Sequence, residues 1–124
     1  MTEDLQDNYS LYDGKLGFGE HSALILVDFV QAYFDKSCEM YAAVENELSS
    51  ALRIRELARE AGIKVIYTNV VYQQDGHDGG VFFKKAPVLK NFVVGNPMGN
   101  WPEGLQPASD EIVISKQYPS AFFG

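Results

Sequence analysis

Two charged side chains stand directly at the ends of apolar runs in this sequence. Asp28 follows the aliphatic residues 24–27, and Lys116 follows the aliphatic residues 112–114 and one serine. An ammonium beside a carboxylate stabilises the charged form of each group, and together they can deprotonate a third group such as a thiol and stabilise its anion. The same pair can also be a purely structural ion pair, and the spacing of the two residues alone leaves both interpretations open.

The elements that would position this pair are a strand, a helix and two further strands. Residues 22–28 predict a first strand, buried on both faces as in a parallel sheet, because their aliphatic run is continuous. Residues 42–61 predict a helix from an apolar stripe that Arg55 interrupts, and Gly62 follows as a left-handed stop. Residues 63–72 are mostly β-branched or aromatic and predict the second strand, and residues 111–116 predict a third, short apolar strand.

Strand, helix and strand in this order form a βαβ unit, whose two strands lie parallel in one sheet. Ligands of such sheets bind beyond the carboxyl ends of the strands. We therefore expect Asp28 and Lys116 to share that edge and to approach within salt-bridge distance. Residues 73–110 form the long irregular connection, with room for a short helix within 81–94, and such connections commonly build substrate walls.

Composition narrows the class of protein. The chain has 124 residues and a formal net charge of −7, which predicts one domain without a nucleic-acid surface. It contains no apolar run near 18 residues and a single cysteine, so we expect no membrane partner and a cytoplasmic location. Residues 1–20 are polar but hold several aromatics, which predicts an arm packed on the domain or on a neighbouring subunit.

Three stretches resemble one enzyme family, the isochorismatase-like cysteine hydrolases. LVDFVQAY at 26–33 looks like the first-strand motif of that family, GIKVIYT at 62–68 like its second strand, and SKQYPSAFFG at 115–124 like its lysine segment. YTNVVY at 67–72 and GGVFF at 79–83 look most like the branch of N-carbamoylsarcosine amidohydrolase and related amidases. Residues 21–124 would then be the N-terminal part of such a hydrolase domain.

The resemblance implies a three-layer α/β/α Rossmann-like fold, of which this chain would hold the front strands only. It implies an Asp–Lys–Cys triad that hydrolyses a C–N bond of a small amide or N-carbamoyl compound. Asp28 would be the general base, Lys116 would favour the thiolate, and Tyr33 would line the substrate pocket. No metal or organic cofactor is implied, and relatives usually form dimers or tetramers.

One departure from the family concerns the nucleophile. The family places its cysteine beyond its lysine, after a further helix and strand, whereas this sequence ends at Gly124. We therefore expect a cysteine outside these residues, and a 124-residue chain that is inactive alone. Two alternatives stay open: a vinyl-ether hydrolase of the isochorismatase type, which needs no cysteine, and a catalytically inactive homologue that serves as a binding or assembly partner.

Three other places could carry chemistry. Cys38 is the only thiol, but a lone cysteine is more often a small hydrophobe, and we expect no catalysis there. His77, with Asp75 and Asp78, has the side chains of a metal site but lies in a glycine-rich turn, so we expect no metal. Trp101 is either a substrate-binding residue or the anchor of its loop.

Overall fold

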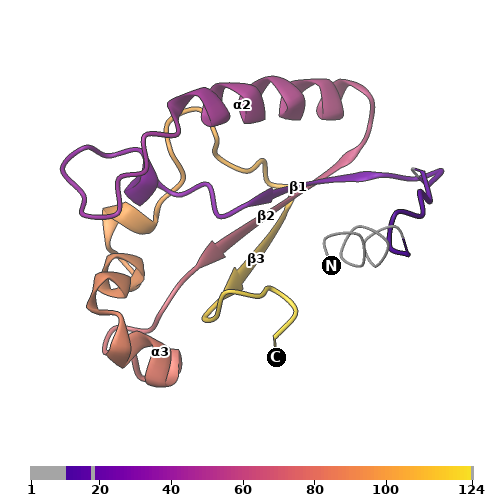
Figure 1. Ribbon diagram of the computed structural model, residues 1–124. Coiled ribbons are helices and arrows are strands. Elements are labelled where there is room, and N and C mark those ends of the chain that lie inside the picture. The colour runs from indigo at the N-terminus through magenta and orange to yellow at the C-terminus, as the bar shows by residue number, and fades with distance from the viewer. Residues whose placement is uncertain (1–10, 18, 124) are drawn as a thin grey trace, which may run out of the picture.

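A parallel sheet of three strands forms the centre of the computed structural model, which describes residues 11–17 and 19–123 (Figure 1). Strand β1 spans Ala23–Val27, β2 spans Lys64–Val70 and β3 spans Ile112–Lys116, in the spatial order β1-β2-β3. Helix α2, Glu45–Glu60, connects β1 to β2. The predicted βαβ unit and the parallel third strand are confirmed, with each element shorter than expected by one to four residues at its ends.

The register of the sheet explains how residues 88 positions apart in sequence can meet. Val27 pairs with Thr68, and Val70 pairs with Lys116, so β1 and β3 lie on either side of the carboxyl-terminal part of β2. Two strand spacings separate the backbones of β1 and β3, about 9 to 10 Å. Only a long side chain crosses that gap above β2, and lysine provides it.

Helix α2 covers one face of the sheet. Ala51, Arg55 and Ala58 are its buried residues, so the interruption of the apolar stripe by Arg55 lies inside the interface. The helix ends as the sequence predicts: Gly62 adopts a φ of +69°, and the N–H of Ile63 donates to the carbonyl of Ala58 at 2.8 Å. β2 follows at once and returns parallel to β1.

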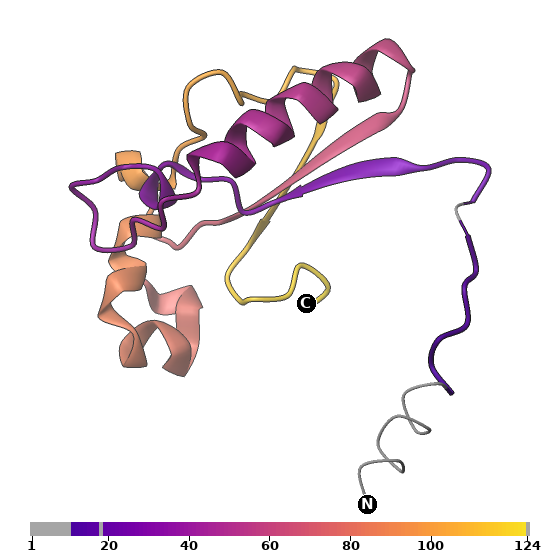
Figure 2. The same ribbon diagram turned by 45° about the horizontal axis from the view of Figure 1, so that its top comes forward.

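Among the described residues no helix covers the other face of the sheet, and Figure 2 shows α2 on one side of the strands only. Four side chains of this face are apolar and exposed, with fractions of 38 to 58%: Ile25, Val27, Ile112 and Ile114. The expectation that the first strand is buried on both faces is therefore wrong for the described chain. Likewise, the described residues supply two of the three expected layers, a helix and the sheet.

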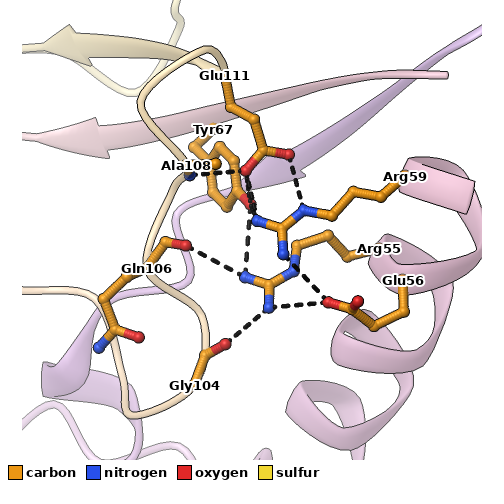
Figure 3. A network of polar contacts seen from close by, with 8 residues as sticks. All are labelled: Arg55, Glu56, Arg59, Tyr67, Gly104, Gln106, Ala108 and Glu111. Atoms are coloured by element: carbon orange, nitrogen blue, oxygen red, sulfur yellow. Dashed lines mark hydrogen bonds and ion pairs between the residues drawn. The ribbon is translucent and has the colours of Figure 1, made fainter. Parts of the chain in front are cut away.

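A polar network fastens β3 to α2 at the amino end of the sheet (Figure 3). Glu111, next to the first residue of β3, accepts hydrogen bonds from Arg59, from the Tyr67 hydroxyl at 3.0 Å and from the Ala108 N–H at 2.8 Å. Arg55 is 5% exposed and donates to the Gly104 carbonyl at 2.8 Å. Burial of a guanidinium is costly unless it is hydrogen-bonded, and these contacts explain its place in the stripe.

The first part of the connection from β2 to β3, residues 71–99, lies beyond the carboxyl ends of β1 and β2, and the rest returns past α2 to the amino end of β3 (Figure 1). It contains η2 (His77–Gly79), α3 (Gly80–Lys85), η3 (Pro87–Phe92) and η4 (Pro97–Gly99). The short helix expected within 81–94 is thus present as α3 and η3. The segment is tied to β2 by Tyr72, whose N–H donates to the Phe92 carbonyl at 2.9 Å and whose carbonyl accepts from the Val94 N–H at 2.8 Å.

The expected N-terminal arm is described only in part. Its residues 11–17, 19 and 20 are exposed, and Tyr12 and Leu16 expose 85% and 101% of their surface, so this part does not pack on the domain. Residues 1–10 and 18 lie outside the described residues, and packing of the arm on a neighbouring subunit stays a prediction. No helix among the described residues is long and apolar enough to cross a membrane.

Candidate active site

Asp28 begins a sharp turn of the chain at the end of β1. Its φ of +57° lies in the left-handed region, which aspartate tolerates better than most residues other than glycine. The turn is held by the Asp28 N–H, which donates to the Thr68 carbonyl at 3.1 Å, and by the Asp28 carbonyl, which accepts from the Val30 N–H at 3.0 Å. The local backbone thereby fixes where the carboxylate lies.

Lys116 reaches this carboxylate from the end of β3. Its Nζ lies 2.9 Å from Asp28 Oδ2, so the expected approach within salt-bridge distance is confirmed. The lysine side chain is 5% exposed and the aspartate side chain 27% exposed. A buried ammonium therefore supports a carboxylate that still has access to solvent, and this asymmetry suits a base that must receive a proton from a third group.

The ammonium of Lys116 has one more acceptor, the carbonyl of Pro119 at 2.8 Å. This contact comes from the turn that follows β3 directly. A lysine ammonium has three N–H donors, and within the described part of the chain the third has no acceptor. It is thus available for negative charge that develops on a reacting group.

Thr68 contacts the other carboxylate oxygen of Asp28. Its hydroxyl donates to Oδ1 at 2.8 Å and accepts from the Asp28 N–H at 3.3 Å. No motif of the sequence points to this residue. Its place beside Asp28 depends on the strand register that pairs Val27 with Thr68, which only the structure gives.

Tyr33 lies beside the pair, in the short helix η1 (Gln31–Tyr33) that follows the Asp28 turn. Burial raises the pKa of its phenol, and the negative charge of Asp28 raises that pKa further. Its ring packs against Phe92 with centroids 6.3 Å apart. Tyr33 therefore stands between the Asp28 carboxylate and the apolar cluster of the connecting segment, which is where a pocket wall is expected, although its contact with substrate stays a prediction.

Trp101 lies on the opposite face of the sheet from the pair. Its ring packs edge-on against Tyr67 at 5.4 Å, within the cluster under α2. Tyr67 and Thr68 are neighbours in β2 and so point to opposite faces, and Thr68 faces the Asp28 carboxylate. These contacts are those of a loop anchor, one of the two interpretations that the sequence left open. The other interpretation, a contact of Trp101 with substrate, stays a prediction, and the contacts described here do not support it.

The remaining candidates, Cys38 and His77, contact other residues than Asp28 and Lys116. Cys38 is partly buried and packs against the cluster of Val30 and Phe92, as a small hydrophobe does. His77 Nδ1 contacts Asp75 Oδ1 at 2.5 Å on an exposed turn, which raises the pKa of the imidazole. Within residues 11–17 and 19–123, no three histidine, cysteine or carboxylate side chains gather as metal ligands would.

The sequence of this chain is similar to one protein family and to two known enzymes. The isochorismatase domain, as a protein family, matches residues 22–124 of the chain. Maleamate amidohydrolase of Pseudomonas putida is 40% identical over 125 residues, which cover 98% of this chain and 59% of that protein. N-carbamoylsarcosine amidase of an Arthrobacter species is 29% identical over 138 residues, which cover all of this chain and 51% of that protein.

A solved structure agrees with the fold. The cysteine hydrolase from Pseudomonas syringae superposes with a TM-score of 0.77 at 22% identity, over 89% of this chain and 55% of that one. At this identity the likeness concerns the fold alone. The chain spans between half and three fifths of the length of the curated relatives that it matches.

Proposed function

The chain belongs to the isochorismatase family, and on that premise we propose that the protein carrying it hydrolyses the C–N bond of a small amide or N-carbamoyl compound. The observation that carries the proposal is the 2.9 Å contact between buried Lys116 and half-buried Asp28 at the carboxyl edge of the sheet. The names of its two curated relatives, an amidohydrolase and an amidase, support the choice of bond.

The proposed roles follow from the charges of the pair. Asp28 accepts the proton of a thiol, and the Lys116 ammonium stabilises the thiolate and the negative charge that develops on the substrate oxygen. The thiolate attacks the amide carbon, the C–N bond breaks, and the nitrogen leaves as ammonia with the proton that Asp28 returns. Water then hydrolyses the acyl-enzyme and restores the thiol. An amide substrate yields its carboxylic acid, and an N-carbamoyl substrate yields a carbamic acid, which loses carbon dioxide to give the amine.

We place the nucleophilic thiol outside these 124 residues. Cys38 is the only cysteine of the chain, and it packs against the apolar cluster that contains Val30 and Phe92. This packing is the one expected of a cysteine that acts as a small hydrophobe. Tyr33 completes the proposal as a wall of the pocket. No metal or organic cofactor is part of it, and a homo-oligomer, dimer or tetramer, is the assembly that we expect.

Ammonia release tests the function and the nucleophile together. We expect the protein that carries this chain to release ammonia from maleamate or from N-carbamoylsarcosine, and treatment with iodoacetamide to abolish the release. Cys38→Ser is the matched variant, and it should retain both the activity and its sensitivity to alkylation. The reason is that the reacting thiol is a different one, so removal of Cys38 leaves it in place.

Each other outcome contradicts a stated part of the proposal. Turnover of amides that survives complete alkylation would exclude a cysteine nucleophile. Loss of activity in a folded Cys38→Ser protein would place the nucleophile at Cys38. If no amide is hydrolysed but an isochorismate-like vinyl ether is, the alternative chemistry holds. If neither substrate class reacts, the chain is an inactive homologue.

A further inference from the structure

We propose that Thr68 is a positioning residue, which fixes the plane of the Asp28 carboxylate so that this group can act as a base. The inference rests on the proposed function, because the base matters only if a proton is transferred to it. Its evidence is a pair of reciprocal hydrogen bonds. The Thr68 hydroxyl donates to Asp28 Oδ1 at 2.8 Å and accepts from the Asp28 N–H at 3.3 Å.

The carboxylate needs such a donor because its own torsion is soft. The last side-chain torsion of aspartate has a broad, roughly two-fold profile, so a single contact leaves the plane of the carboxylate free to turn. Lys116 holds Oδ2 at 2.9 Å, and Thr68 holds Oδ1. With one donor on each oxygen, the plane is fixed. A carboxylate oxygen accepts two hydrogen bonds, so each keeps a free lone pair for the incoming proton.

Thr68 is well suited to this task by its own rigidity. It lies in the middle strand, is 3% exposed, and is β-branched, which restricts its first side-chain torsion. Its hydroxyl is also neutral. It therefore orients the carboxylate without adding a second positive charge, which would disfavour the protonated state that a base must reach.

The test compares three variants in the protein that carries this chain. Thr68→Val keeps the shape of the side chain and removes the hydroxyl, whereas Thr68→Ser keeps the hydroxyl. Ser115→Ala is the matched control, because the Ser115 hydroxyl makes a hydrogen bond of the same length, 2.8 Å, to Asn69 Oδ1. Ser115 neighbours Lys116 in β3 and so points to the opposite face, away from the pair.

We expect Thr68→Val to lower kcat for ammonia release by about 10- to 100-fold with little change in KM, the effect of losing one hydrogen bond to a charged group. Thr68→Ser should stay within about threefold of the wild type, and Ser115→Ala should be unchanged. Thr68→Val with wild-type kcat would overturn the proposal. So would an equal loss in Thr68→Ser, because packing of the methyl group would then explain the effect.

A crystal structure of Thr68→Val gives a readout that does not need activity. We expect the Asp28 carboxylate to turn away from its present plane in this variant and to keep that plane in Thr68→Ser. An unchanged carboxylate in Thr68→Val would overturn the positioning role even if the wild type hydrolyses no amide. Absence of amidase activity in the wild type, in contrast, refutes the proposed function and leaves this structural comparison to decide the role of Thr68.

Discussion

We expect replacement of Asp28 with asparagine to lower kcat for the proposed amide hydrolysis by about a hundred- to ten-thousand-fold, the contribution of a general base. The substitution removes the charge and the basic lone pair and little else. Asparagine tolerates the φ of +57° as aspartate does. Its amide can turn so that the oxygen accepts from Lys116 while the nitrogen donates to the Thr68 hydroxyl. The fold should therefore survive, and the loss should lie in the chemical step.

The measurement is kcat for ammonia release, with thermal melting to show that the variant is folded. Asp110→Asn is the control, because Asp110 is exposed and precedes β3 at the amino end of the sheet, whereas Lys116 ends it. We expect that variant to keep wild-type activity. A folded Asp28→Asn protein with full activity would show that the pair is structural, the other interpretation that the sequence left open.

The pair should also behave as one unit. Lys116→Met removes the partner of Oδ2, and the double variant Asp28→Asn/Lys116→Met should be no slower than the slower of the two single variants. Additive losses, measured as kcat for ammonia release, would instead indicate that the two groups act on separate steps.

The approach of Asp28 to Lys116 could be predicted because it depends only on the order of strands and helix along the chain. Continuous apolar runs mark the strands, a βαβ unit makes them parallel, and charges at equivalent strand ends must then meet. The role of Thr68 was not predictable in the same way. Its contact with Asp28 depends on which residue of β2 stands opposite Val27, and register is decided by the whole sheet rather than by a local pattern.

Burial was predicted less well than topology. A continuous aliphatic run indicates a strand with two apolar faces, but it does not say what covers them. In the described chain α2 covers one face, and Ile25 and Val27 expose about half of their surface on the other. Arg55 shows the opposite case. Its position in the apolar stripe looked like a flaw, yet the carbonyl of Gly104 and the hydroxyl of Tyr67 give it partners that only the tertiary fold supplies.

We expect replacement of Glu111 with glutamine to lower the free energy of unfolding by up to about 3 kcal/mol at neutral pH. The hydrogen bonds from Arg59, helped by those from the Ala108 N–H and the Tyr67 hydroxyl, lower the pKa of this carboxyl to about 2 against the opposing effect of burial. The ordinary value is 4.5. Because the folded state favours the charged form of Glu111, it is stabilised at every pH at which Glu111 is ionised. Arg59 is partly exposed, and solvent screens its charge, so about 3 kcal/mol is an upper bound for this stabilisation.

The sign of the pH dependence follows from the lowered pKa. The contribution is fully present above the unfolded value near 4.5 and is lost as the pH falls through the folded value near 2. Urea unfolding of both proteins should therefore show a difference that is constant from pH 7 to about pH 5 and shrinks toward pH 2. Glu60→Gln, at the exposed end of α2, is the control and should change stability by less than about 0.5 kcal/mol.

A difference between wild type and Glu111→Gln that stays constant down to pH 2 would assign the effect to packing rather than to the charge. The network of Figure 3 joins α2 to the amino end of β3, whereas Lys116 stands at the carboxyl end of that strand. At a temperature well below melting, Glu111→Gln should therefore leave kcat unchanged while it lowers stability. Asp28→Asn should instead lower kcat, because its partners lie at the other end of the sheet. Together, the two variants distinguish the polar network that stabilises the sheet from the charged pair that the sheet positions.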